Sequence, residues 1–232
     1  MNLRPRPGAR ASHGPPYGAL LLDLDGCLID SNGAHARAWS RALARFGFPV
    51  SPRRIRPHIG KGGAELLREF VPRAARHFLA DALGAEQTRI FLASDRRRRV
   101  RGFDGAAAAV RAMRRSGVRI VIASSADRRV VALALRRLRL ADAVDGYTTS
   151  NDVAKTKPFE DVFAVAIARF RLEGRRPVAI GDTPYDIAAA HQIGVPCIAL
   201  ASGGARPRSL ASADARYRDL ADLWKRGREL FA

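Results

Sequence analysis

Short, continuous apolar segments recur along the chain and predict buried β-strands. The first spans residues 19–24, and others follow at 118–123, 178–180 and 195–200. Each segment is too short for an amphipathic helix and lacks the alternation of a half-exposed strand. Continuous apolar runs are typical of strands that are covered on both faces. These segments therefore predict the central strands of a sheet.

Stretches with helical periodicity separate the predicted strands. Residues 34–46 place their apolar side chains on one helical face, and Gly47 is expected to end that helix. Parallel neighbouring strands need crossover connections, so strands that alternate with helices predict an α/β fold with a doubly wound, Rossmann-like parallel sheet. Further helices are expected at residues 106–115, 128–138, 159–170 and 187–192.

The region between the first two predicted strands shows helical patterns only, up to about residue 93. An all-helical insertion at this point predicts a mobile cap over the core. Residues 1–16 are rich in Pro, Gly, Arg and Ser and are expected to form a mobile tail. We therefore expect a catalytic core formed by residues 17–31 and 101–232, and an all-helical cap formed by residues 32–100.

The chain carries a formal net charge of +19, which raises the question of nucleic-acid binding. Only four of its 41 basic residues are lysines, and the arginines are spread along the whole chain. The densest basic run, residues 96–99, has no interleaved aromatic residues on which bases could stack. We therefore expect a general attraction to anionic substrates and no specific nucleic-acid partner.

Several features bear on where the protein works. No apolar run approaches the roughly 20 residues that span a bilayer. Pro, Gly and Ser stand where a signal peptide would have its apolar stretch. Cys27 and Cys197 have neither metal-ligand spacing nor a disulfide framework, so both are interpreted as reduced thiols. A cytoplasmic protein without a membrane partner is expected, as a monomer or homodimer.

Polar residues follow the predicted strands at their carboxyl ends. Asp23 and Asp25 end the first strand, Ser124 follows the second, and Asp182 follows the third, with Asp186 four residues further on. Carboxyl ends of parallel strands meet at one edge of the sheet, where ligands bind. Carboxylates that converge there would repel one another without a fixed cation. The pattern therefore predicts a divalent metal ion.

The residue types at this edge indicate phosphoryl transfer, and we expect a magnesium-dependent phosphatase. Oxygen ligands without nearby His or Cys select a hard ion, and Mg²⁺ suits a small phosphorylated substrate. Asp23 is expected to attack the phosphorus and form an aspartyl-phosphate. Asp25 is expected to protonate the leaving oxygen and then to activate water. Ser124 and Lys157, the latter in the loop between the second and third predicted strands, are expected to bind phosphate oxygens.

Four segments together resemble the motifs of the haloacid dehalogenase superfamily hydrolases, in the phosphoglycolate-phosphatase-like branch with a helical cap. The resemblance covers about residues 19–220, and the set of motifs is highly specific. The segments are Asp23-Leu24-Asp25-Gly26-Cys27-Leu28-Ile29-Asp30-Ser31, Ser124, Lys157-Pro158 and Gly181-Asp182-Thr183-Pro184-Tyr185-Asp186.

The resemblance implies a role for each aspartate. Asp23 would be both nucleophile and metal ligand. Asp25 would be the general acid and base, and would offer its backbone carbonyl to the metal. Asp182 would be a metal ligand, with Asp186 a further or water-mediated one. By the same resemblance, the serine and lysine of the motif set bind phosphate.

The chain also departs from the family pattern. The family usually has Thr where Cys27 stands, and we expect activity to survive this change because the backbone matters more there than the side chain. The usual K-P-x-P-D reads K-P-F-E-D at residues 157–161, a change outside the phosphate contact. Dehalogenases of the superfamily lack a counterpart of Asp25 and need no metal, so Asp25 argues against dehalogenation.

Three other functions remain open from the sequence. A sugar-phosphate mutase is an alternative, because His35 stands where those mutases carry a histidine that helps to gate the acid/base residue. Against it, the cap loop at residues 60–63 lacks the arginine that holds a distal phosphate. Phosphonate cleavage needs a cap lysine, and Lys61 suits substrate contact better. A non-catalytic anion- or nucleic-acid-binding protein is the second alternative.

Arg56, Lys61 and His35 are the cap residues that we expect to face the substrate.

Overall fold

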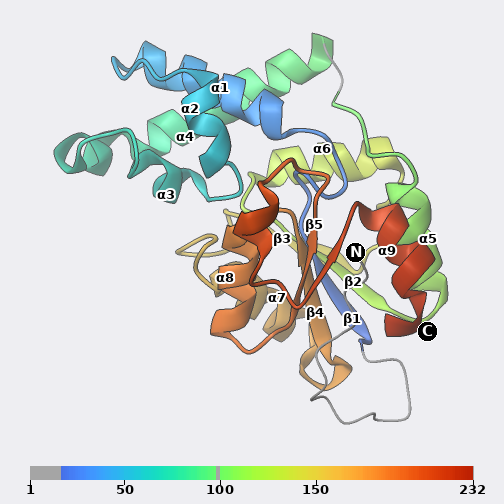
Figure 1. Cartoon of the computed structure of the whole chain (residues 1–232). Coiled ribbons are helices and arrows are strands. Elements are labelled where there is room, and N and C mark those ends of the chain that lie inside the picture. The colour runs from blue at the N-terminus through green and yellow to red at the C-terminus, as the bar shows by residue number, and fades with distance from the viewer. Residues whose placement is uncertain (1–16, 98–99, 232) are drawn as a thin grey trace.

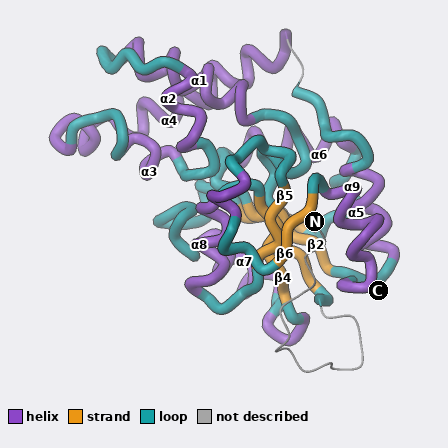
Figure 2. The backbone as a smooth tube through the Cα atoms, viewed as in Figure 1, coloured by secondary structure: helices purple, strands orange, loops and turns teal. Residues whose placement is uncertain are grey.

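A computed structural model describes residues 17–97 and 100–231. Its centre is one sheet of six parallel strands in the order β3-β2-β1-β4-β5-β6 (Figures 1 and 2). The first strand, β1, lies in the interior of this sheet, and the later strands lie on both sides of it. This order confirms the predicted doubly wound α/β fold. The strands are β1 (Ala19–Leu22), β2 (Arg119–Ala123), β3 (Gly146–Thr148), β4 (Pro177–Gly181), β5 (Cys197–Leu200) and β6 (Ala215–Tyr217).

The strand register brings the polar strand ends together. Leu22, the last residue of β1, pairs with Ile122 on one side and with Ile180 on the other. Asp23 follows directly, at the same edge as the residues that follow β2 and β4, among them Asp182. The predicted meeting of carboxylates at one edge is thus a consequence of this alignment.

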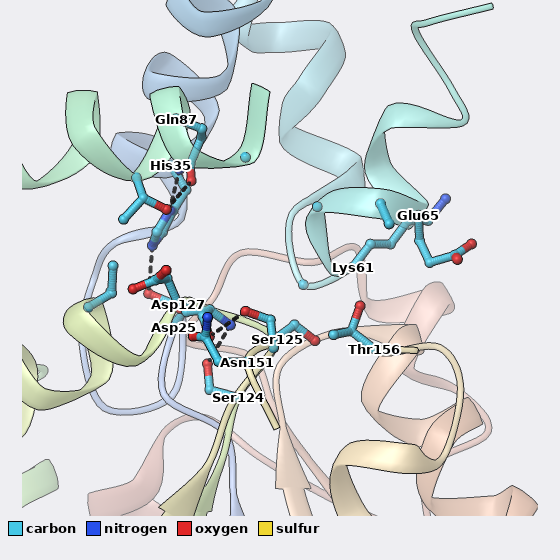
Figure 3. Close-up of a pocket in the computed structure, with 18 of the residues that line it drawn as sticks. Asp25, His35, Lys61, Glu65, Gln87, Ser124, Ser125, Asp127, Asn151 and Thr156 are labelled. Carbon is cyan, nitrogen blue, oxygen red and sulfur yellow. Dashed lines mark hydrogen bonds and ion pairs between the residues drawn. The ribbon is translucent and has the colours of Figure 1, made fainter. Parts of the chain in front are cut away.

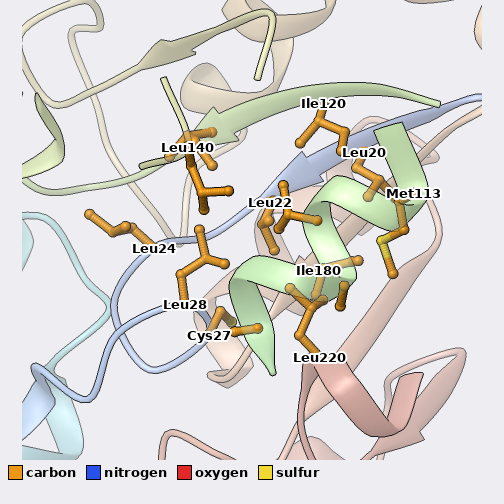
Figure 4. Packing of buried hydrophobic residues seen from close by; sticks show 14 of the residues in the cluster. Leu20, Leu22, Leu24, Cys27, Leu28, Met113, Ile120, Leu140, Ile180 and Leu220 are labelled. Atoms are coloured by element: carbon orange, nitrogen blue, oxygen red, sulfur yellow. The ribbon is translucent and has the colours of Figure 1, made fainter. Parts of the chain in front are cut away.

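Helices cover both faces of the sheet. α5, α6 and α9 pack on the face to which Leu20 and Leu22 point (Figure 4), and α7 and α8 pack on the face of Leu21. Side chains alternate along a strand, so two buried faces require the continuous apolar runs seen in the sequence. The bounds are α5 (Ala106–Arg115), α6 (Arg128–Leu138), α7 (Asp161–Phe170), α8 (Pro184–Gln192) and α9 (Leu220–Gly227).

Four helices between β1 and α5 lie together apart from the sheet, at the top of Figure 1. They have an apolar core of their own, in which Trp39, Leu43 and Leu66 are buried. No strand occurs among residues 32–97, as expected for an all-helical cap, and the exact limits of that cap stay a prediction. The helices are α1 (Asn32–Arg45), α2 (Pro52–Ile55), α3 (Gly63–Leu67) and α4 (Arg73–Arg97).

The structure adds elements that the apolar runs did not predict: β3, β6 and α9. Both strands are three residues long and lie at the two edges of the sheet, and β6 has no buried residue. An edge strand has one neighbour and less cover, so it needs no continuous apolar run. Because β3 was not predicted, Lys157 was expected between the second and third strands. In the structure it lies between the third strand, β3, and the fourth, β4.

α8 also begins earlier than predicted, at Pro184. Thr183 caps it: the Thr183 side chain accepts from the backbone of Asp186, whose carboxylate accepts from the Thr183 backbone. The predicted mobile tail, residues 1–16, lies outside the described residues, as do residues 98 and 99 of the arginine run. Among the described residues, no helix is long and apolar enough to cross a membrane.

Candidate active site

Asp23 and Lys157 form a buried ion pair at the carboxyl end of β1. The Nζ atom of Lys157 lies 2.7 Å from Oδ1 of Asp23 and donates to the carbonyl oxygen of Ala123, also at 2.7 Å. A second carboxylate, Asp186, lies 2.7 Å from the same ammonium. The exposed fraction of the Lys157 side chain is 1%. One cation therefore holds two carboxylates where water cannot screen them.

Burial dominates the electrostatics of these groups. It raises the pKa of Asp23 to about 7, although the neighbouring Lys157 acts in the opposite direction. Burial, followed by the charges of Asp186 and Asp23, raises the pKa of Asp182 well above its usual range. Burial alone would lower the pKa of Lys157, but Asp186 and Asp23 raise it above its usual value. The site thus has more negative charge than one ammonium can stabilise.

Asp25 lies beside this pair and has partners of its own. Its Oδ1 accepts from the Ser31 hydroxyl and lies 3.0 Å from Nε2 of His35 (Figure 3). Burial would raise the pKa of Asp25, but His35 and Ser31 outweigh it and hold that pKa below its usual value. The Gln87 amide donates to Nδ1 of His35 at 3.0 Å, and the imidazole stacks on Phe91 with ring centroids 3.9 Å apart. His35 therefore donates through Nε2 to Asp25.

A group of metal-binding atoms lies next to the nucleophile position. One ligand atom each from Asp23, Cys27 and Asp182 lies within 4.8 Å of the others. Oδ1 of Asp182 is buried and has no hydrogen-bond partner among the described residues, while its Oδ2 accepts from Asn32 at 2.9 Å. Burial, then the charge of Asp182, raises the pKa of the Cys27 thiol well above its usual range. Two buried carboxylates, one with a free oxygen, fit a hard divalent ion such as Mg²⁺.

Asp186 is placed differently from the other predicted metal ligands. Its Oδ2 accepts from the Thr183 hydroxyl at 2.6 Å and from the Thr183 backbone at 3.1 Å. Its Oδ1 pairs with Lys157. The carboxylate therefore holds the lysine and caps α8, and a further or water-mediated place for it around the metal stays a prediction.

Two glycines let the backbone approach the Asp182 carboxylate. Gly26 has a φ of +82°, and a Cβ atom there would lie 2.2 Å from Oδ2 of Asp182. A Cβ atom at Gly203 would lie 1.5 Å from the same oxygen. Any side chain at either position would displace the carboxylate.

Ser124, the predicted phosphate ligand, is buried directly after β2. Its hydroxyl accepts from the backbone of Ala126 at 3.1 Å, in the turn that leads into α6. The Oγ of Ser125 is buried without a hydrogen-bond partner among the described residues. Backbone N–H groups before a helix and free hydroxyls suit the binding of phosphate oxygens.

A cavity of about 480 Å³ opens above these residues, between the sheet edge and the cap. Asp23, Asp25 and Ser124 line it from the core, and Figure 3 labels the last two. The cap residues in its lining include His35, Trp39, Lys61, Glu65 and Gln87.

The three predicted cap residues occupy different environments. His35 lines the cavity and contacts Asp25, whereas Lys61 lines the cavity but directs its ammonium to Glu69, at 2.7 Å. Arg56 does not line this cavity, and its Nη2 donates to the carbonyl oxygen of Gly203 at 3.0 Å. Substrate contact by Lys61 and Arg56 stays a prediction.

Arg56 belongs to a row of contacts between cap and core. The Tyr185 hydroxyl donates to the carbonyl oxygen of Pro57 at 3.0 Å, and the backbone of Gly62 donates to that of Lys157 at 3.3 Å. These contacts join the cap to the loop after β5, to the first turn of α8, which follows Asp182, and to the loop that carries Lys157.

Sequence reasoning missed Asn32 and Gln87. Asn32 donates to Asp182 and to the Gly203 carbonyl. It follows directly on the motif at residues 23–31, and this position could have identified it as a site residue. Gln87 lies on α4, 52 positions from the histidine that it contacts, and no local pattern connects the two.

A model of the haloacid dehalogenase-like hydrolases matches residues 17–194. The chain belongs to this family. Validoxylamine A 7'-phosphate phosphatase of Streptomyces hygroscopicus subsp. limoneus is 28% identical over 207 residues, which are 89% of this chain and 96% of that protein. A phosphoglycolate phosphatase of Cupriavidus necator is 28% identical over 194 residues, 83% of this chain and 84% of that one.

Solved structures show the same fold. A hydrolase from Pseudomonas syringae superposes with a TM-score of 0.81 at 25% identity, over 93% of this chain and 100% of that one. A candidate β-phosphoglucomutase from Bacteroides vulgatus has a TM-score of 0.76 at 21% identity, over 94% of this chain and 90% of that one. The expected family, its phosphoglycolate-phosphatase-like branch and the enzyme class, a phosphatase, are confirmed.

Proposed function

We propose that this haloacid dehalogenase-like enzyme hydrolyses a small phosphorylated metabolite with Mg²⁺, through a phosphoryl group carried by Asp23. One observation carries the proposal: a buried carboxylate at the end of the central strand opens on a cavity and is held by a buried lysine. Asp25 and Ser124 line the same cavity. Nucleophile, acid/base and phosphate ligand are thus within one site.

In the first step a carboxylate oxygen of Asp23 attacks the phosphorus, and the bond from phosphorus to the leaving oxygen breaks. Asp25 gives its proton to that oxygen, so the product leaves as an alcohol. In the second step Asp25 takes a proton from water as the water oxygen attacks the phosphorus. Inorganic phosphate leaves and Asp23 is restored.

Asp25 must hold a proton at the first step, although its pKa is lowered in the substrate-free molecule. A phosphate dianion placed beside this carboxylate raises its pKa again, because like charges disfavour ionisation. Lys157 and Ser124 stabilise the charge on the phosphoryl oxygens.

The metal would be held by Asp23 and Asp182, with the backbone carbonyl of Asp25 as a third ligand. When bound, Mg²⁺ supplies positive charge that offsets the repulsion between carboxylates and phosphate. Support comes from the buried Asp182 oxygen that has no partner among the described residues. The pKa values raised by burial also favour a bound cation.

A mutase stays the second candidate, because His35 contacts Asp25 as a gating histidine would. Such an enzyme must hold a second phosphate, which favours a free guanidinium in the cap. Arg129 is the arginine in the described lining of the cavity, and its side chain binds Asp127. Water therefore competes well for the phospho-enzyme, and hydrolysis is favoured.

The test is release of inorganic phosphate from p-nitrophenyl phosphate with and without Mg²⁺, together with the mass of acid-quenched enzyme. Metal-dependent release and one phosphoryl group on the peptide that contains Asp23 support the proposal. Release without any phospho-enzyme, under conditions that trap it in a known relative, would contradict the covalent route.

A further inference from the structure

The cavity differs in charge from the rest of the molecule. The whole chain has a net charge of +19, yet the cavity is lined by five acidic residues and three lysines or arginines. Two of the acids, Asp23 and Asp25, belong to the catalytic end. The others are Glu65 and Asp81 on the cap and Asp127 at the start of α6, so outside the catalytic end the lining has as many carboxylates as cations. The acidic residues are Asp23, Asp25, Glu65, Asp81 and Asp127, and the basic residues are Lys61, Arg129 and Lys155.

Each of the three cations already has a partner. Lys61 pairs with Glu69 and lies 5.1 Å from the centroid of the Tyr185 ring. Arg129 donates from two nitrogens to the carboxylate of Asp127, at 2.9 and 3.2 Å. The ammonium of Lys155 lies 4.7 Å from the centroid of the Phe159 ring. A second anionic group on the substrate would have to compete with Glu69 for Lys61 or with Asp127 for Arg129, whereas the exposed Lys155 has no carboxylate partner among the described residues.

The acids of the cap are less fully neutralised. Asp81 on α4 is exposed, and no side chain among the described residues forms an ion pair or hydrogen bond with it. Glu65 on α3 pairs through Oε2 with Nε of Arg68 at 3.2 Å, and its side chain is 12% exposed. A carboxylate or second phosphate near these groups would be repelled, whereas an ammonium would be attracted.

The remaining lining provides space and neutral polar groups. Glycine and alanine occupy several cap positions, which leaves room for a leaving group larger than two carbons. Ser125, Asn151, Thr156 and Gln87 offer hydroxyl and amide groups (Figure 3). Such groups bind hydroxyls without a charge requirement. The small cap residues are Gly63, Ala64, Ala80, Gly84 and Ala85.

We propose that the natural substrate is the phosphate ester of a polyhydroxylated leaving group without a second anionic group, and that the cap prefers a protonated amine to a carboxylate. This inference rests on the proposed phosphatase function and specifies its substrate. In this proposal selectivity arises at Asp81 and Glu65, which line the cavity from cap helices α4 and α3.

The test compares substrates that differ in one charged group. Phosphoethanolamine and phosphoglycolate share a two-carbon frame, and glucosamine 6-phosphate, glucose 6-phosphate and 6-phosphogluconate share a six-carbon frame. We expect kcat/KM to be at least about tenfold higher for the amine than for the carboxylate in each frame. Glucose 6-phosphate should lie between the other two.

Variants locate the effect. Asp81→Asn and Glu65→Gln should each lower the amine-to-carboxylate ratio several-fold. Glu69→Gln should lower it as well, because it frees Lys61 to bind a carboxylate. Asp142→Asn is the matched control: Asp142 is exposed and does not line the cavity, so the same change of charge should leave the ratio unaltered.

The two proposals fail in different ways. Hydrolysis of p-nitrophenyl phosphate with phosphoglycolate favoured over phosphoethanolamine would overturn this inference and leave the phosphatase function standing. Absence of any Mg²⁺-dependent hydrolysis would overturn the phosphatase function. In that case, the increase in Tm on titration with phosphoethanolamine and with phosphoglycolate tests the inference through binding. A larger increase with phosphoethanolamine is expected, and a larger increase with phosphoglycolate would overturn the inference.

Discussion

The two walls of the cavity hold their charged groups in opposite ways. At the sheet edge, Asp23, Lys157 and Asp182 are each 5% exposed or less, and the positions of Asp23 and Asp182 follow from the strand register. On the cap wall, Asp81 is exposed and Lys61 is shared with Glu69. Burial strengthens electrostatic interactions and suits chemistry common to all substrates. Charged groups that can change partners suit discrimination between leaving groups. Each contributes little binding free energy, but it can repel a leaving group of like charge.

The largest effect is expected from Asp23→Asn. The amide removes the nucleophile and one charge at the metal site, so kcat should fall by around 10³-fold or more while the fold persists. Phosphate release and circular dichroism measure the two properties. Activity above a tenth of wild type with a normal spectrum would mean that the core wall does not carry the chemistry.

Removal of the metal should lower phosphatase activity almost as much as Asp23→Asn does. Chelation should abolish phosphate release and Mg²⁺ should restore it, whereas Ca²⁺ should inhibit, because its looser coordination tends to bind the attacking carboxylate through both oxygens. The measurement is activity after chelation and dialysis against each ion. Full activity after verified metal removal would assign the carboxylates another purpose.

Lys61→Ala on the cap wall and Arg56→Ala at the contact between cap and core should have smaller, substrate-dependent effects. Cap residues act on the leaving group, so relative rates among metabolite phosphates should change several-fold more than the rate on p-nitrophenyl phosphate. For Arg56 the reason is its bond to Gly203, which joins cap and core. Equal losses on all substrates would show that these side chains only maintain the structure.

Mutase and phosphatase activities can be separated with a hexose 1-phosphate, with and without the corresponding bisphosphate, followed by ³¹P NMR. We expect phosphate and dephosphorylated product to accumulate together, because no free arginine of the described lining would retain a bisphosphate. Isomer formation that is stimulated by bisphosphate and outruns phosphate release would reverse the order of the two candidates.

The smallest effect concerns stability of the metal-free enzyme. The folded-state pKa of Asp23 is raised to about 7 and that of Asp182 is raised well above its usual range. Their contribution to stability is therefore present below about pH 4 and lost as the pH rises through 7. In EDTA, Tm should be several degrees lower at pH 8 than at pH 5.5. Addition of Mg²⁺ should raise Tm by more degrees at pH 8 than at pH 5.5.

The control for this effect is Asp23→Asn, which should reduce the pH dependence of Tm because the amide does not titrate and only the contribution of Asp182 remains. A metal-free Tm that rises from pH 5.5 to 8 in wild type, with the same rise in the variant, would show that burial of these carboxylates does not govern stability.

The apolar pattern of the chain was sufficient to predict the central strands and the helices between them, and the catalytic roles assigned at their ends stay a prediction. Strands buried on both faces need continuous apolar runs, and parallel strands of similar length end at one edge of the sheet. Asp23, Ser124 and Asp182 can therefore be placed together from the amino-acid sequence alone. The edge strands β3 and β6 were missed, because a short strand with one neighbour needs no such run.

The surroundings of these groups depend on tertiary packing. The contact of His35 with Gln87, the pairing of Lys61 with Glu69 and the bond from Arg56 to Gly203 join separate helices and loops. Hydrophobic periodicity tells which face of a helix is buried but not which polar side chains meet across the interface. Those meetings depend on how the cap helices pack over the sheet edge, and they set the charge and shape of the leaving-group wall.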